Sequence, residues 1–226
     1  MSQIVDKIHS RGYWRIIIRP FEYISGRVKY SDLLPILQRT SVQTRSMGFP
    51  HVDPYQPLAH KQLNWIGHEF ELMDFIEAWR FYQSGQFAQR SAMWLDWREQ
   101  AGWGADHGGW KPGVALGINE TVVRFTEIFE FASRLALSEI KAEQFHIDIT
   151  ICNINDRFLF NENPMQTGFA HKYKTAITEF PYVKDVYQQE LIAQAKDLAL
   201  DASRELFARF DWTPSQDFLR TMQSGE

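Results

Sequence analysis

Three histidines lie beside an aspartate or two residues from one, an arrangement that can bind a metal ion. The pairs are His51 with Asp53, Asp106 with His107, and His146 with Asp148. On a strand, residues two apart point to the same face, so His146 and Asp148 could bind the same metal ion. No third metal ligand can be identified from the spacing. The sequence therefore predicts no metal site and no cofactor.

Common catalytic motifs each lack a necessary residue. His68 and Glu69 are not followed by the second histidine of H-E-x-x-H, and the glycines of residues 102–117 fit neither a P-loop nor a dinucleotide-binding loop. Nucleophilic catalysis has no G-x-S-x-G elbow, and Cys152 lies in an apolar segment typical of a buried, inert thiol. The lack of these motifs favours a non-enzymatic protein. The alternative is a metal-assisted enzyme acting on nucleotides or nucleic acid, built from scattered acids and histidines.

A first candidate binding set combines guanidinium groups, an amide and a phenol ring. Its members are Arg80, Tyr82, Gln89 and Arg90. Planar donors beside a ring suit an acidic peptide, a nucleotide or RNA bases. The alternative interpretation is an ordinary solvated strand face covered by cross-strand pairs.

A second candidate set lies in residues 100–117, which carry six glycines, two tryptophans and a proline. Its members are Trp103, Asp106, His107 and Trp110. Long irregular loops are uncommon in compact domains unless they have a role, and exposed tryptophans can anchor a partner. The alternative is that both indole rings fold back to close the core.

The first set needs a hairpin to position it. Two aromatic-rich runs within residues 77–95 flank Ser84-Gly85, a dipeptide suited to a tight turn. A two-residue loop there pairs Arg80 with Gln89 and Tyr82 with Phe87. Further strands are expected at residues 13–19 and 65–75, and a second hairpin is expected from residues 145–150 and 157–160.

Three helices are expected around these strands, at about residues 31–45, 119–140 and 183–210. Asn119 is the expected cap of the second helix, where Arg124, Glu127, Glu130 and Arg134 are expected to be solvated. Strands joined by short turns, with helices between groups of them, indicate a single α+β domain over residues 1–226. Its sheet is expected to be mainly antiparallel, with helices packed on one face.

Composition limits the environment and the partners. The 226 residues carry a net charge of −4, which gives no overall attraction for nucleic acid. Cys152 is the only cysteine, so no intramolecular disulfide and no paired-thiolate zinc site can form. The sequence has neither a signal-peptide pattern nor a run of about 18 apolar residues. We therefore expect a cytoplasmic protein without membrane contact.

Three segments carry a resemblance to a known group of proteins: GYWRIIIRP at residues 12–20, FPHVDP at residues 49–54 and EAWRFYQSGQF at residues 77–87. They resemble a bacterial family, without assigned catalytic or binding residues, that occurs alone or beside Schlafen-type nucleic-acid-binding modules. The resemblance covers about residues 12–98. It implies a regulatory or defence-associated protein and transfers no activity.

The aromatic content of 15 % exceeds what a core of this size needs, so some rings are expected to face a partner. Together with the missing catalytic motifs, this predicts a recognition, accessory or regulatory domain that binds a protein partner or a small ligand. A nucleic-acid partner is the less favoured expectation because of the net charge. The sequence does not determine the oligomeric state.

Overall fold

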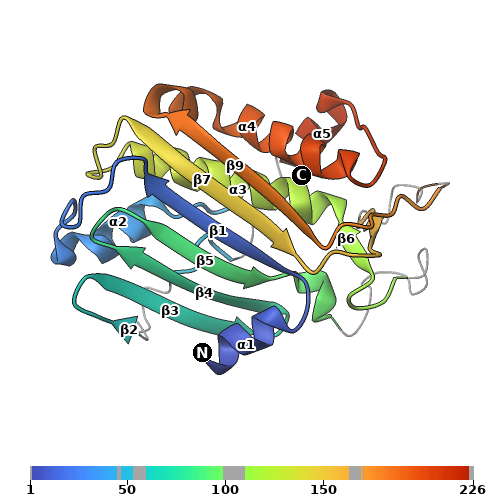
Figure 1. Ribbon diagram of the computed structural model, residues 1–226, viewed down its shortest axis with the longest axis horizontal. Coiled ribbons are helices and arrows are strands. Elements are labelled where there is room, and N and C mark those ends of the chain that lie inside the picture. Colours follow the sequence, from blue (N-terminus) through green and yellow to red (C-terminus); the bar gives the residue numbers. More distant parts are fainter. Residues whose placement is uncertain are drawn as a thin grey trace.

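A seven-stranded antiparallel sheet forms the centre of the molecule (Figure 1). The computed structural model describes residues 2–44, 47–52, 60–98, 110–162, 169 and 171–223. In spatial order the strands are β2 (His60–Lys61), β3 (Trp65–Leu72), β4 (Phe75–Tyr82), β5 (Phe87–Ala92), β1 (Tyr13–Pro20), β7 (Gln144–Cys152) and β9 (Glu179–Tyr187). The prediction of an α+β fold with a mainly antiparallel sheet is confirmed.

Helices cover the two faces of this sheet unequally. Those described are α1 (Gln3–His9), α2 (Leu33–Thr40), α3 (Ile118–Ala136), α4 (Gln188–Ala208) and α5 (Gln216–Gln223). Residues of α2 to α5 join one large core with the sheet, whereas α1 packs Ile8 against Ile76 and Ala92 on the opposite face. We call the face that carries α1 the outer face. Because α1 is short, it covers only part of that face (Figure 1).

Alternation along β1 shows how the sequence separates the two faces. Trp14, Ile16 and Ile18 are at most 1 % exposed and lie in the large core, where the Trp14 ring contacts Phe125 of α3, while the residues between them are partly exposed. A strand of β-branched and aromatic residues fits this pleated, half-buried position. The two arginines of β1, Arg15 and Arg19, therefore lie on the outer face.

The predicted β4–β5 hairpin is present, but its predicted register is wrong by one residue. Arg80 pairs with Ala88, and Gln89 pairs with Trp79. The loop has three residues, because the Tyr82 N–H donates to the Gln86 carbonyl at 2.9 Å. Gly85 adopts a φ of 84°, the left-handed conformation that ends a three-residue hairpin loop. A slip of one residue moves a side chain to the other face of the sheet.

Helix α3 departs from the prediction at both ends. It ends at Ala136 rather than near residue 140, and its N-cap is Gly117 rather than Asn119. The Glu162 carboxylate caps the helix, accepting the N–H groups of Asn119 and Glu120 at 2.9 Å each. A Cβ atom on Gly117 would collide with this carboxylate, which explains the glycine. Predicting this cap would have required knowing a contact between segments distant in the sequence.

The expected hairpin from residues 145–150 and 157–160 does not form. β7 pairs instead with β1 and β9, and β8 (Phe158–Phe160) pairs in parallel with β6 (Ala115–Gly117) in a separate sheet. A buried ion pair holds the start of β8 near Asp96. Two guanidinium nitrogens of Arg157 donate to the two oxygens of the Asp96 carboxylate, at 2.7 and 2.5 Å. Asp96 also accepts the Gly12 N–H at 2.8 Å.

Two expected helices begin or end elsewhere. Residues 179–187, part of which was expected to begin the last helix, form β9, and α4 starts only at Gln188. In β9, Phe180, Tyr182 and Val186 are buried at even spacings, which is the period of a strand. The apolar positions of α4 follow directly, so the sequence shows no gap between the strand and the helix. The first expected helix is also shorter, ending at Thr40. Among the described helices, none is long and apolar enough to cross a membrane.

Candidate functional site

Four arginines lie on the outer face of the sheet, which α1 covers only in part. We call Arg15, Arg19, Arg80 and Arg90 the arginine face. They come from three neighbouring strands, β4, β5 and β1. Arg80 and Arg90 are exposed, and Arg15 and Arg19 are partly exposed. Asp148 on β7 shares this face, and its carboxylate accepts the Thr150 hydroxyl at 3.3 Å, so the positive charge is concentrated on β4, β5 and β1 rather than over the whole face.

Arg15 and Arg90 lie directly opposite each other across the β1–β5 ladder. Like charges in this position repel, since opposing Cβ atoms are about 5 Å apart. Arg15 donates to the Thr150 hydroxyl at 2.9 Å and has no carboxylate partner in the described part of the chain. Arg90 likewise forms no ion pair with a described residue. A bound anion would relieve this repulsion.

Trp65 supports Arg80 at one side of the arginine face. The guanidinium of Arg80 lies 4.6 Å from the centre of the Trp65 ring, a cation–π contact. Gly67 makes this possible, because a Cβ atom there would lie 2.9 Å from the Trp65 ring and 3.3 Å from Arg80 Cγ. The Tyr82 ring lies 6.2 Å from that of Trp65. Arg80 is thus held in place.

Two exposed rings lie at the end of the outer face where β1 and β9 finish. The Phe21 N–H donates to the Gln144 carbonyl at 2.9 Å, and Gln144 pairs with Tyr187. Phe21 is 52 % exposed and Tyr187 is 63 % exposed. Alternation from Arg19 places Phe21 on the same face as that arginine. The outer face therefore offers cationic groups and accessible rings together.

Gln89 does not belong to this surface, although the sequence grouped it with Arg80. It is 1 % exposed on the core side, where its Nε2 donates to the Glu77 carboxylate at 2.7 Å. The other Glu77 oxygen accepts the His51 N–H at 2.9 Å. Of the predicted set, the structure therefore brings Arg80, Tyr82 and Arg90 to one face and excludes Gln89.

A buried charged cluster lies beneath the hairpin, where helix α3 meets the sheet. Arg124 and Glu127, which were expected to be solvated, are 4 % and 1 % exposed, and their charged atoms lie 3.3 Å apart. Burial raises the pKa of Glu77 to about 8, and the charge of Arg124 offsets part of this effect. The expectation failed because residues 42–44 and 47–52, together with the sheet, cover this side of α3.

A cavity of about 250 Å³ adjoins this cluster. Arg124 and Glu127 line it together with Ser91, Phe75 and Trp94. Its size is near the lower limit for small-molecule sites. Arg124 and Glu127 neutralise each other there, so the cavity offers polar groups without a clear charge preference.

The predicted glycine-rich loop lies mostly outside the described residues. This applies to Trp103, Asp106 and His107. Trp110 is described, and its ring packs partly buried against a small cluster that includes Leu95 and Phe158. This placement matches the alternative in which the ring closes the core.

Of the three histidine–aspartate pairs, only His146 and Asp148 are both described, and His146 has a different partner. His146 bonds Asp185 on β9, with Nδ1 and Oδ1 2.6 Å apart. Asp53, Asp106 and His107 are outside the described residues. Within the described part, no group of three or more His, Cys, Asp or Glu side chains could hold a metal ion. Cys152 is 1 % exposed, and burial raises the pKa of its thiol.

Sequence reasoning missed Arg15, Arg19 and Trp65. Arg15 and Arg19 were visible as the polar positions within YWRIIIR, and alternation alone places both on one face. Their proximity to Arg80 and Arg90 depends on the strand order, since β1 inserts between β5 and β7. That order joins segments more than 60 residues apart.

No protein-family model, no curated protein and no solved structure matches this chain. The function must therefore be argued from the fold and from the side chains it brings together.

Proposed function

We propose that this chain is a non-enzymatic recognition domain, and that its arginine face binds an acidic segment of a protein partner. The opposed pair Arg15 and Arg90 carries the proposal, because neither guanidinium has a carboxylate partner in the described part of the chain. Guanidinium groups bind carboxylates through paired, charge-assisted hydrogen bonds. An acidic segment lying across β5 and β1 would satisfy both arginines at once.

The setting of this function is also a proposal. The resemblance of residues 12–98 to a bacterial family supports a role as an accessory domain in a regulatory or defence system. The free thiol of Cys152 suits a reducing compartment, so we place the protein in the cytoplasm.

Single-stranded nucleic acid is a second candidate ligand for the same face. The exposed rings of Phe21 and Tyr187 beside Arg19 favour it, since bases stack on aromatic rings while arginines contact phosphates. The net charge of −4 disfavours it, although the arginine face is locally basic.

Fluorescence anisotropy with two labelled probes separates these candidates. One probe is a twelve-residue peptide of alternating Glu and Ser, and the other is a twelve-nucleotide single-stranded RNA. We expect the peptide to bind, with an affinity that falls as salt rises. The double variant Arg15→Gln/Arg90→Gln should weaken peptide binding at least tenfold.

The matched control is Arg39→Gln/Arg220→Gln, which removes the same charge from two exposed arginines that are paired with Glu139 and Asp197. This control should bind the peptide within twofold of the natural chain. Equal losses in both double variants would show non-specific attraction and contradict the proposal. Tighter binding of RNA, lost in Phe21→Ala and Tyr187→Ala, would support the second candidate instead.

A further inference from the structure

β9 leaves one edge of the sheet open. It is the last strand in the sheet order and pairs with β7 alone among the described strands. It is nine residues long, whereas β2 at the opposite edge has only two. A long edge strand presents a row of backbone donors and acceptors to which another strand can pair.

The register shows which backbone groups face this open edge. The Gln188 N–H donates to the Glu143 carbonyl at 2.8 Å, so Gln188 directs its backbone toward β7. In an antiparallel ladder this direction alternates, which turns the C=O of Pro181 and the N–H and C=O groups of Val183 and Asp185 outward. Pro181 fits this assignment, because a proline is tolerated where no N–H is needed for the ladder.

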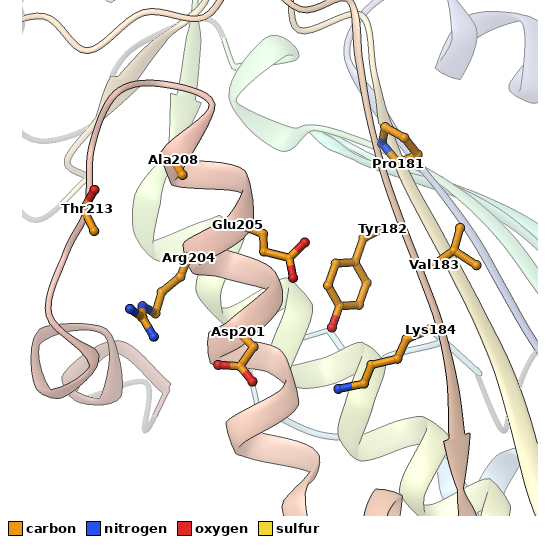
Figure 2. A pocket seen from close by; sticks show the side chains of 9 residues that line it. All are labelled: Pro181, Tyr182, Val183, Lys184, Asp201, Arg204, Glu205, Ala208 and Thr213. Atoms are coloured by element: carbon orange, nitrogen blue, oxygen red, sulfur yellow. The ribbon is translucent and has the colours of Figure 1, made fainter.

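A groove of about 650 Å³ runs beside this edge, between β9 and α4 (Figure 2). The strand wall consists of residues 181–184, and the helix wall includes Asp201, Glu205 and Ala208. The volume is within the range of about 300–1,000 Å³ found for ligand sites. A chain segment added to β9 would therefore lie with one side against a helix.

Tyr182 points from the strand into this groove (Figure 2). It is 6 % exposed, and its hydroxyl forms no hydrogen bond with a described residue. Burial raises the pKa of Tyr182, and the carboxylates of Glu205 and Asp201 raise it further. The hydroxyl therefore remains a neutral donor facing two acids.

Asp201 and Glu205 give the groove its charge preference. They are four residues apart on α4 and face the strand, a like-charge spacing that is unfavourable on a helix (Figure 2). Neither forms an ion pair within the described part of the chain. Two cations also line the groove: Lys184 extends toward α4, with its Nζ 3.9 Å from Glu190 Oε1, whereas Arg204 points away from Tyr182 (Figure 2).

We propose that β9 and α4 bind an extended peptide segment of another protein, which adds to the sheet as an eighth strand and places a Lys or Arg side chain beside Asp201 and Glu205. Strand addition supplies affinity through the backbone, and pockets for alternate side chains supply specificity. The segment spans at least Pro181 to Asp185, about 13 Å of extended chain. Its charge is opposite to that of the ligand proposed for the arginine face.

Selection from a phage-displayed library of random ten-residue peptides tests this site. Enriched peptides should carry Lys or Arg, with apolar or β-branched residues at alternate positions. Synthetic copies, followed by anisotropy, should bind at least tenfold more weakly to Val183→Pro, which removes an outward N–H. Val183→Thr, which keeps the N–H, should bind normally.

Charge reversal and hydrogen exchange provide two further measurements. Glu205→Lys should weaken binding at least tenfold, while Glu22→Lys, an equal charge change on the exposed loop after β1, should not. Bound peptide should slow exchange of the Val183 and Asp185 amides at least tenfold. Circular dichroism of each variant establishes that it is folded.

Three results would overturn the proposal. One is a selection in which no enriched peptide is sensitive to Val183→Pro. Another is peptide protection confined to amides outside β9. The third is a dimer in light scattering that Val183→Pro converts to a monomer, since the edge would then pair with a second copy of this chain. If acidic peptides lost binding only to the Arg15→Gln/Arg90→Gln variant, they would bind at the arginine face and would not support the β9 site.

Discussion

Gln89 donates a 2.7 Å hydrogen bond to Glu77 inside the core, where both side chains are at most 1 % exposed. An ionised carboxylate in such a place loses its hydration, and burial accordingly raises the pKa of Glu77 from 4.5 to about 8. At neutral pH the folded protein therefore holds Glu77 mostly protonated.

This shift predicts that stability falls as pH rises from about 4.5 to about 8. Across this window the unfolded chain has released the Glu77 proton and the folded protein still holds it, so raising the pH favours unfolding. Glu77→Gln cannot ionise and should remove this dependence. The contribution is on the order of 5 kcal/mol at most, from 1.36 kcal/mol per pKa unit.

Urea unfolding at several pH values between 4 and 9 measures this effect. The natural chain and Glu77→Gln should diverge as pH rises, with the variant the more stable at pH 8. The exposed Glu139 supplies a control, since Glu139→Gln should follow the natural chain. Parallel stability curves for the natural chain and Glu77→Gln would contradict a raised pKa in the folded state.

Gly67 should tolerate no side chain. In Gly67→Ala the new Cβ would lie 2.8 Å from the Trp79 carbonyl oxygen and 2.9 Å from the Trp65 ring. We expect a loss of about 1–3 kcal/mol in the free energy of unfolding, as for other overpacked sites. Displacing Trp65 and Arg80 should also weaken ligand binding at the arginine face.

Gly26 provides the matched control, because a Cβ atom there meets nothing within 4 Å. Gly26→Ala should change unfolding by less than about 0.5 kcal/mol. If Gly67→Ala cost as little free energy of unfolding as Gly26→Ala in thermal and urea unfolding, the close contact between Gly67 and the Trp65 ring would be wrong.

Local patterns predicted the elements whose partners are near in sequence. The β4–β5 hairpin and α3 follow from turn residues and apolar spacing within a short window. The start of α4 was misplaced because Val183 and Val186 fit both a helical stripe and a strand paired with β7. Only the contact with residues 144–152 decides between these, and no local window contains it.

The candidate site shows the same limit. Arg80 and Tyr82 share one face as predicted from strand alternation, but one additional loop residue sends Gln89 into the core and brings Arg90 to the face of Arg80. Arg15 and Arg19 join them only because β1 lies between β5 and β7. Loop length and strand order, rather than residue type, determined which side chains meet.

Glu162 should stabilise α3 from outside the helix. Its two carboxylate oxygens accept the N–H groups of Asn119 and Glu120, as a side-chain cap does. Glu162→Ala should therefore cost about 0.5–2 kcal/mol in urea unfolding. Asn119→Ala should be nearly neutral, because Asn119 supplies only its backbone N–H; the opposite ranking would restore Asn119 as the cap.

The Asp96–Arg157 ion pair joins three segments at one end of the sheet, and its loss should be the most damaging single change. Asp96 is fully buried and also accepts the N–H groups of Gly12 and Gly113. Asp96→Asn preserves the shape but leaves the Arg157 cation, 3 % exposed, without a counterion. Breaking a buried pair in this way costs about 3–5 kcal/mol. Asp197→Asn breaks an exposed pair with Arg220 and should cost at most about 1 kcal/mol in the same urea titration, so similar losses in the two variants would show that burial does not govern this ion pair.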